Sequence, residues 1–182
     1  LADLNGDSAL DTISGGYGGF QVLLGNGDGT LQGPSNPKTD YPSTGIALRD
    51  LDNDGDLDAV TANVYGDGLS VLLGSGNGTF APAVQFSTGI GPPRVVGEGP
   101  NFSPPAISPR AVSLVLGDVN RDGVIDIVVG NAGQCGYYAG AMRSVCPNSG
   151  TVAVLIGQGD GSFGPAMEFD VGSDPESVVL GD

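Results

Sequence analysis

The sequence predicts an all-β protein of about three four-stranded antiparallel blades of the propeller type, each carrying one acidic loop. Three observations favour this class. A nine-residue acidic motif recurs three times, a glycine-rich turn alternates with it, and the repeated unit is about 47–49 residues long, as in a propeller blade. No sequence window shows sustained helical spacing of apolar residues, so short strands joined by turns are expected.

The acidic motif has the composition of a calcium-binding loop. Its copies read D-L-N-G-D-S-A-L-D, D-L-D-N-D-G-D-L-D and D-V-N-R-D-G-V-I-D. Calcium takes six to eight oxygen ligands, and each copy offers a carboxylate or amide at positions 1, 3, 5 and 9. The predicted side-chain ligands of three Ca²⁺ sites are Asp3, Asn5, Asp7 and Asp11; Asp50, Asp52, Asp54 and Asp58; and Asp118, Asn120, Asp122 and Asp126. Backbone carbonyls at position 7 complete the sets, from Ala9, Asp56 and Val124.

Two other interpretations of this motif fit the sequence less well. An EF-hand loop ends in a glutamate at position 12 and is flanked by helices, whereas position 12 here is Ser14, Thr61 or Val129 within strand-like sequence. A solvated acidic turn without a metal is the alternative, because Asp, Asn and Gly are common in turns. Three copies with the same spacing disfavour it. Position 6 is Gly55 or Gly123 in two copies, which predicts a positive φ there. Ser8 takes that place in the first copy, so a strained turn is expected.

The glycine-rich motif marks hairpins. It begins at Gly25, Gly74 and Gly157, and each copy follows an apolar run. Phosphate binding by such a motif needs a following helix, and none is expected. In the second unit the predicted strands are Ile46–Leu48, Ala59–Ala62, Leu69–Leu73 and Ala83–Phe86. We expect one repeat domain over residues 1–182, with blades at about 1–47, 48–115 (insert 89–109) and 116–182 (insert 134–149).

Composition limits the classes of function and the cellular locations that the sequence is consistent with. The 182 residues include 6 Lys and Arg against 21 Asp and Glu, for a net charge of −15, which disfavours a nucleic-acid surface. No apolar run is long enough to span a membrane, and the start has neither the basic nor the apolar segment of a signal peptide. The sequence begins inside a repeat, so we expect a portion of a longer polypeptide. Acidic calcium loops suit millimolar calcium, so we expect an extracellular or cell-surface location.

Covalent modification is compatible with that compartment. Cys135 and Cys146 lie in a Gly-rich segment without strand pattern, and a disulfide between them is expected if the protein is exported. Two free thiols are the alternative. Two sequons, at Asn77 and Asn101, permit glycosylation where the host has the machinery.

Together these motifs resemble the FG-GAP/VCBS repeat family, whose members include the blades of integrin α-subunit propellers. The resemblance is carried by the three acidic loops, by the Val-Leu-Leu-Gly runs with their glycine turns, and by the related phrases at Ser113–Asp118 and Ser177–Asp182. It implies calcium ligands at the residues named above. Propellers of this family close with more than three blades. The resemblance therefore implies an incomplete propeller, completed by the rest of a longer chain or by other copies.

The leading hypothesis is an extracellular calcium-binding structural or adhesion module that presents loops to partners and can self-assemble. The contact surface would lie on the inserts, with the apolar groups Phe102, Tyr137, Tyr138 and Met142. The alternatives are a carbohydrate-binding, lectin-like propeller and a scaffold within a larger secreted enzyme or toxin. Catalysis is not expected, because the chain has no His, no Ser or Cys has a plausible base partner nearby in sequence, and most candidate acid–base carboxylates are assigned to calcium. Asp40, Asp67 and Glu98 meeting in one cleft without an ion would favour catalysis.

Overall fold

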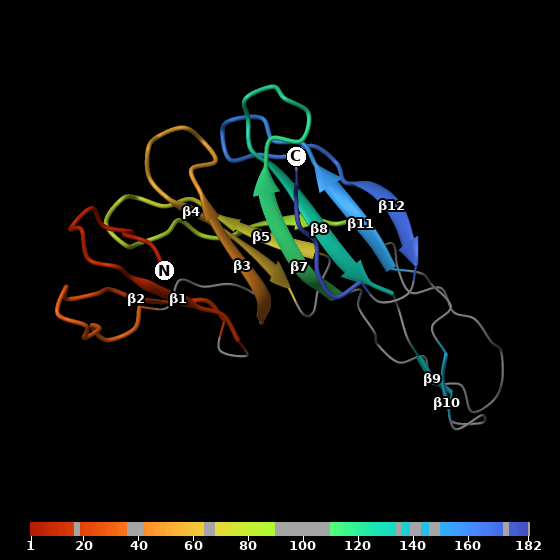
Figure 1. Ribbon diagram of the computed structural model, residues 1–182, viewed down its shortest axis with the longest axis horizontal. Helices are drawn as coiled ribbons and strands as arrows, with labels where there is room; N and C mark the ends of the chain where they lie inside the picture. The colour runs from red at the N-terminus through yellow and green to blue at the C-terminus, as the bar shows by residue number, and fades with distance from the viewer. Residues whose placement is uncertain are drawn as a thin grey trace.

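The strands of this protein form a row of antiparallel sheets (Figure 1). The computed structural model describes residues 1–16, 19–35, 42–63, 68–89, 110–133, 136–138, 143–145, 150–172 and 175–181. Within these ranges the regular elements are all strands, which confirms the predicted all-β class. None of the described segments forms a helix long and apolar enough to cross a membrane. The described strands do not show a closed ring.

Two sheets have the four antiparallel strands of a blade. Blade 2 consists of β3 (Ser43–Arg49), β4 (Asp58–Asn63), β5 (Gly68–Leu72) and β6 (Val84–Ser87), in that order across the sheet. Blade 3 consists of β7 (Arg110–Gly117), β8 (Asp126–Ala132), β11 (Gly150–Leu155) and β12 (Met167–Gly172). Blade 1 is represented by the described part of residues 1–35, in which β1 (Thr12–Ser14) pairs with β2 (Gln21–Leu23).

The strands predicted for the second unit are confirmed, with small shifts at their ends. The repeat boundaries expected at 47/48 and 115/116 fall inside β3 and β7. The sheets therefore run from Ser43 to Ser87 and from Arg110 to Gly172. A whole blade begins before its acidic loop, because the strand that leads into the loop pairs with the strand that leaves it.

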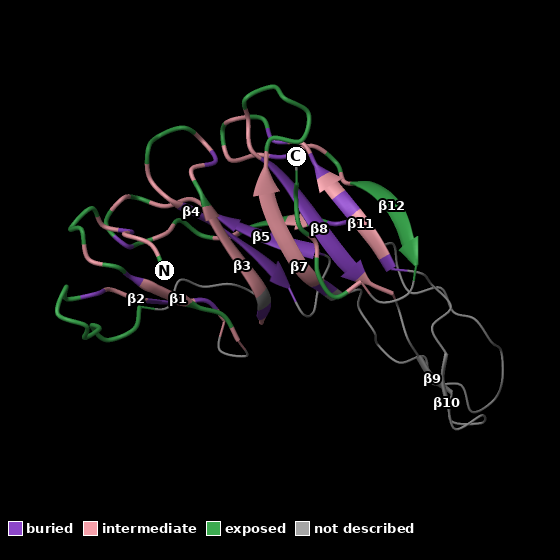
Figure 2. Ribbon diagram, viewed as in Figure 1, coloured by how far each residue is buried: buried purple, intermediate pink, exposed green. Residues whose placement is uncertain are grey.

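Burial follows the position of a strand in its sheet. All of β4 and β5 are buried, whereas every residue of the last strand, β12, is exposed (Figure 2). Strands buried on both faces need apolar or small residues at nearly every position, which explains the run Ala59, Val60, Thr61 and Ala62. The inner strands are therefore the structural core of each blade.

The hydrophobic cores lie between consecutive blades. Phe20 of blade 1 meets Phe80 of blade 2 edge to face, with ring centroids 5.3 Å apart. Phe86 of blade 2 meets Phe163 of blade 3 in the same way at 5.5 Å. One buried cluster thus joins blades 1 and 2, and a second joins blades 2 and 3. Edge-to-face aromatic pairs of this kind add about 0.5–1.5 kcal/mol beyond the area that they bury.

The second insert departs from the prediction of a segment without strands. It contains a short antiparallel hairpin of β9 (Gly136–Tyr138) and β10 (Arg143–Val145). Its strand formers are Tyr137, Tyr138 and Val145, whose aromatic and β-branched side chains favour extended backbone even between glycines. The two cysteines lie outside the described residues, so their pairing stays a prediction.

Candidate metal centre

The three acidic loops occupy one place in the repeat. The second loop joins β3 to β4, the third joins β7 to β8, and the first leads into β1. In Figure 1 the second and third loops project beyond the upper ends of the sheets. Each loop folds around its own side chains, and the same backbone N–H groups bond to the aspartate at position 1 in all three copies.

The aspartate at position 1 organises the backbone of each loop. In the first loop Asp3 accepts the N–H groups of Gly6 and Ser8, both at 2.8 Å. In the second loop the backbone N–H groups at positions 4 and 6 donate to Asp50 at 2.7 and 3.1 Å. In the third loop the same two positions donate to Asp118 at 2.6 and 2.9 Å. These bonds hold the pKa of Asp3 and of Asp118 below the usual value, with the N–H of Ser8 and of Gly123 as the largest causes.

Positions 3 and 5 form successive side-chain turns. In the second loop Asp52 accepts the N–H of Asp54 at 3.2 Å, and Asp54 accepts the N–H of Asp56 at 2.8 Å. The other two loops repeat both bonds, through Asn5, Asp7, Asn120 and Asp122. The residues at position 7 thus donate their N–H groups within the loop, and the use of their carbonyl oxygens as ligands stays a prediction.

Two positions of each loop adopt a positive φ. The prediction for position 6 is confirmed: φ is 94° at Gly55 and 86° at Gly123, and Ser8 is held at 70°. Ser8 is therefore strained, as expected, because a left-handed conformation disfavours a residue with a Cβ. Position 4 was not anticipated, although it is also left-handed, at Gly6, Asn53 and Arg121. Gly and Asn favour this conformation and could have signalled it, but Arg does not.

The aspartate at position 9 is buried and joins its loop to the glycine-rich turn of the same blade. Asp58 is fully buried and accepts the N–H groups of Leu51 and Gly74, each at 2.7 Å. Equivalent pairs of bonds at 2.7–2.9 Å are made by Asp11 and Asp126. Sequence reasoning assigned these residues as metal ligands and missed this structural role. A carboxylate offers about four lone-pair sites, so two backbone bonds leave room for a cation.

The second loop best fits a divalent cation. Oxygen atoms of Asp50, Asp52 and Asp58 lie within 4.8 Å of one another. Among the described residues this is the one group of three or more acidic, Cys or His side chains that converges in this way. Hard oxygen donors so arranged suit Ca²⁺. Asp54, also predicted as a ligand, is not part of this convergence.

The other two loops differ in one respect. Position 3 is an asparagine there, and its side-chain amide donates to the aspartate at position 5. The bond is 2.9 Å from Asn5 to Asp7 and 2.7 Å from Asn120 to Asp122. This amide partly offsets the negative charge of the first and third loops. The second loop has no amide at position 3, because that residue is Asp52. The second loop therefore has the strongest electrostatic need for a cation.

Electrostatic strain in the second loop is evident at Asp58. Burial, the largest cause, raises the pKa of this carboxyl group, and the negative charges of Asp52 and Asp54 raise it further. Hydrogen bonds from Gly74 and Leu51 act in the opposite direction without cancelling the effect. A bound cation would favour the ionised form of this group.

The glycine-rich turns are closed by side-chain bonds rather than adapted to phosphate. Asp160 accepts the N–H of Ser162 at 2.9 Å and its hydroxyl at 2.5 Å. Asp28 with Thr30, and Asn77 with Thr79, make the same pair of bonds at 2.6–3.0 Å. No helix follows any of these turns in the described part of the chain. The sequon residue Asn77 is exposed, and its glycosylation stays a prediction.

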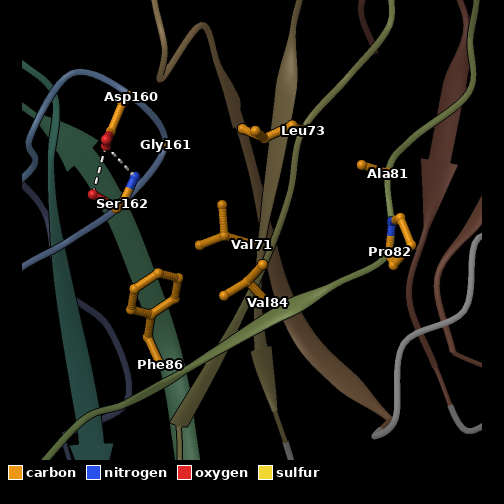
Figure 3. Close-up of a pocket in the computed structure, with 9 residues that line it drawn as sticks. All are labelled: Val71, Leu73, Ala81, Pro82, Val84, Phe86, Asp160, Gly161 and Ser162. Atoms are coloured by element: carbon orange, nitrogen blue, oxygen red, sulfur yellow. Dashed lines mark hydrogen bonds between the residues drawn. The ribbon is translucent and has the colours of Figure 1, made fainter.

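A small apolar cavity lies where the third glycine-rich turn meets blade 2 (Figure 3). Its volume is about 200 Å³. Phe86, Val71 and Val84 line it from the blade, and Asp160 and Ser162 border it from the turn. The cavity is mostly apolar, with its few polar groups bonded to each other.

Several predicted residues cannot be placed. Asn101, Phe102, Cys135, Cys146 and Met142 lie outside the described residues, as do Asp40, Asp67 and Glu98. The backbone of Tyr137 and Tyr138 belongs to β9, and their side chains are not described. The proposed contact surface on the inserts therefore stays a prediction.

Comparisons with known proteins agree with this architecture. The profile of the FG-GAP-like repeat matches residues 3–61 and 50–129. A comparison with curated proteins found no match. The fold is similar to a solved structure of an Agrocybe aegerita lectin, described as the basis of specific recognition of non-reducing terminal N-acetylglucosamine, with 23% identity and a TM-score of 0.53. The match covers 92% of this chain and 36% of the lectin chain, so this chain spans about a third of the lectin's length.

Proposed function

The chain belongs to the FG-GAP-like repeat family, and we propose that it is a calcium-binding structural or adhesion module that works outside the cell or at its surface. The observation that carries this proposal is the convergence of Asp50, Asp52 and Asp58 in the one acidic loop whose position 3 is an aspartate rather than an asparagine. The family match supports it, because it covers all three acidic loops.

The residues that would hold the cation also shape the blade. Asp50, Asp52 and Asp58 would supply side-chain oxygens in the second loop, and the corresponding Asp and Asn residues would do so in the other two. A bound calcium ion would neutralise carboxylates that otherwise repel one another by roughly 1–4 kcal/mol per pair. Because Asp58 also bonds to Gly74, the loop and the glycine-rich turn would become stiff together. Stiff blades would present their loops in fixed positions to partners.

Thermal unfolding with and without calcium tests this proposal. At a free calcium concentration ten times the dissociation constant, one site adds about 1.4 kcal/mol. For a domain of this size that corresponds to a rise in melting temperature of roughly 3–6 °C per site. Excess EGTA should reverse the rise, whereas the same concentration of magnesium should reproduce little of it. A melting temperature unchanged by either calcium or EGTA would rule out stabilisation by the metal.

Carbohydrate binding is a second candidate. Two observations support it: the cavity bordered by Phe86 and Asp160, and the likeness in fold to a lectin. The lining of the cavity is mostly apolar, and the chain has no Trp. Both features favour the structural function over carbohydrate binding. Binding to glycans ending in N-acetylglucosamine, lost in Phe86→Ala but kept in the exposed control Val119→Ala, would support the lectin candidate. We propose no catalytic activity for the chain, since it lacks His.

A further inference from the structure

Consecutive blades in this chain dock through a repeated junction, which is the contact between the acidic loop of one blade and the glycine-rich turn of the next. At both junctions the third glycine of the turn donates its N–H to the residue at position 2 of the loop. Gly78 donates to the carbonyl of Leu4 at 2.9 Å, and Gly161 donates to that of Leu51 at 3.3 Å. The acidic loop of one blade is therefore bonded directly to the blade that follows it.

The residue at position 2 is also bonded to its own loop. Its N–H donates to the buried aspartate at position 9. Leu4 donates to Asp11 at 2.7 Å, and Leu51 donates to Asp58 at the same distance. Leu4 is 6% exposed and Leu51 is 3% exposed, so both residues are buried within their junctions. One buried residue thus connects a proposed calcium ligand with the turn of the neighbouring blade.

Each glycine-rich turn is bonded in turn to the acidic loop of its own blade. The first glycine of the turn donates its N–H to the aspartate at position 9, from Gly74 to Asp58 at 2.7 Å and from Gly157 to Asp126 at 2.9 Å. A turn at a junction therefore has two bonds to acidic loops. Its third glycine bonds to the loop of the preceding blade, and its first glycine bonds to the loop of its own blade.

These bonds form a continuous series along the three acidic loops. The series starts at Asp11, passes through Asp58 and reaches Asp126. Each loop contributes the same buried carboxylate to it, and each junction contributes one glycine-rich turn. A change in the order of one loop can therefore reach the next loop through hydrogen bonds that the structure contains.

The third glycine-rich turn also lies between two acidic loops. A Cβ on Gly159 would lie 3.6 Å from Val124, in the loop of the same blade, and 3.8 Å from the side chain of Asn53, in the loop of the preceding blade. Both distances are those of ordinary packing, so the two loops approach this turn from two sides. At the first junction position 4 of the loop is Gly6, which has no side chain to make the second contact.

Apolar packing keeps the turn from moving independently of the preceding blade. A Cβ on Gly161 would lie 2.7 Å from Leu73, a residue of blade 2 (Figure 3). Phe163, which ends the same turn, packs edge to face on Phe86. The first junction repeats both contacts. Because the interior is close-packed, a turn held in this way transmits a displacement rather than absorbing it.

We propose that the three acidic loops bind calcium with positive cooperativity, which the junctions transmit from blade to blade. This inference rests on the proposed calcium-binding function and concerns the regulation of its sites. When one loop holds a cation, its aspartate at position 9 is fixed, and so is the residue at position 2. That residue orders the next turn, and the turn orders the aspartate at position 9 of the next loop. The next ion then has less conformational entropy to remove, so it binds more tightly.

Electrostatics acts in the opposite direction. The chain has a net charge of −15, and each bound calcium ion reduces the attraction for the next. Salt screens this effect, since the Debye length is about 8 Å at 0.15 M. The hydrogen bonds and packing of a junction are not screened in this way. The increase in affinity due to an occupied neighbouring loop should therefore become larger as salt is added.

Calcium titration of the 182-residue chain at 0.15 M salt, followed by NMR, tests the proposal. The amide signals of Gly25, Gly74 and Gly157 report the three loops separately, because each N–H bonds to the aspartate at position 9 of one loop. Asp52→Ala should abolish binding in the second loop. It should also weaken calcium binding in the first and third loops about fivefold each, because each loses an occupied neighbour.

Gly161→Ala and Gly29→Ala are a matched pair, because both glycines have a positive φ but only Gly161 lies against the preceding blade. Gly161→Ala should uncouple the second and third loops, so that adding Asp52→Ala no longer changes the affinity of the third loop. Gly29→Ala should leave the fivefold effect in place. Asn53→Gly removes a contact with the turn and suits the positive φ at that position, so it should fold normally and also reduce the effect.

Three outcomes would count against these ideas, and they are distinguishable. If calcium binds but Asp52→Ala leaves the affinities of the other two loops unchanged, the cooperativity is overturned and the calcium-binding function stands. Coupling that persists at full strength in both Gly161→Ala and Asn53→Gly would overturn the role of the junction. A chain in which none of the three glycine signals responds to calcium would overturn the proposed function together with this inference.

Discussion

The buried carboxylate of Asp58 accepts the backbone N–H of Gly74 at 2.7 Å and thereby ties the acidic loop of blade 2 to its glycine-rich turn. The two sequence motifs of the repeat are thus one structural unit. The same bond occurs between Asp11 and Gly25, and between Asp126 and Gly157. Loss of this carboxylate should therefore affect stability even where no metal is bound.

Asp58→Asn should destabilise the protein by about 2–4 kcal/mol in EGTA, because an amide replaces one of two acceptor oxygens and leaves a buried N–H without its partner. Denaturant unfolding without calcium measures this directly. Asp54→Asn is the matched control, since Asp54 is exposed and an amide oxygen can still accept the N–H of Asp56. Equal stability of the two variants would show that position 9 acts only through the metal.

Exchanging Asp and Asn at position 3 should shift calcium dependence in opposite directions. Asp52→Asn introduces the amide that the other loops use, so it should raise stability in EGTA by up to about 1 kcal/mol and weaken calcium binding in that loop about tenfold. Asn120→Asp should do the reverse, since it removes the bond to Asp122 and adds a charge. Calorimetric titration measures both affinities, and changes of the same sign in the two variants would contradict the interpretation.

The glycine-rich turns should contribute an acid-sensitive part of the stability. Bonds from Ser162, its hydroxyl first, lower the pKa of Asp160 below 3.8, and bonds from Thr30 do the same for Asp28. A carboxyl whose pKa is lower in the folded protein stabilises the fold above the unfolded value and loses that contribution as the pH falls through the folded value. NMR titration should therefore find both midpoints below 3.8. In Asp160→Asn the acid-sensitive part due to this turn should vanish while the turn persists, as it does around Asn77.

Substitution of two glycines with similar φ distinguishes the free-energy cost of backbone strain from the cost of a steric clash with the neighbouring blade. Gly161 and Gly29 have φ of 77° and 89°, but only Gly161 lies against Leu73 of the neighbouring blade. Gly29→Ala should cost about 1 kcal/mol from backbone strain alone. Gly161→Ala should cost roughly 1–3 kcal/mol more, because the added methyl group overlaps the leucine. Chemical denaturation at low protein concentration compares the two, and equal losses would mean that the junction yields easily.

Much of the architecture could be predicted from local patterns. The acidic loops, the glycine-rich turns and the apolar runs between them determined an all-β repeat, the four strands of blade 2 and the strain at Ser8. These features depend on residues close together in the chain, whose spacing follows the period of a strand or the demands of a turn.

The remaining features depend on the tertiary structure. It made Asp58 a bridge to Gly74, brought Phe86 to Phe163, and distinguished the second acidic loop, where three carboxylates converge, from two loops in which an amide intervenes. Such contacts join residues far apart in the chain. They depend on how sheets register and stack, and no local pattern of residues encodes that packing by itself.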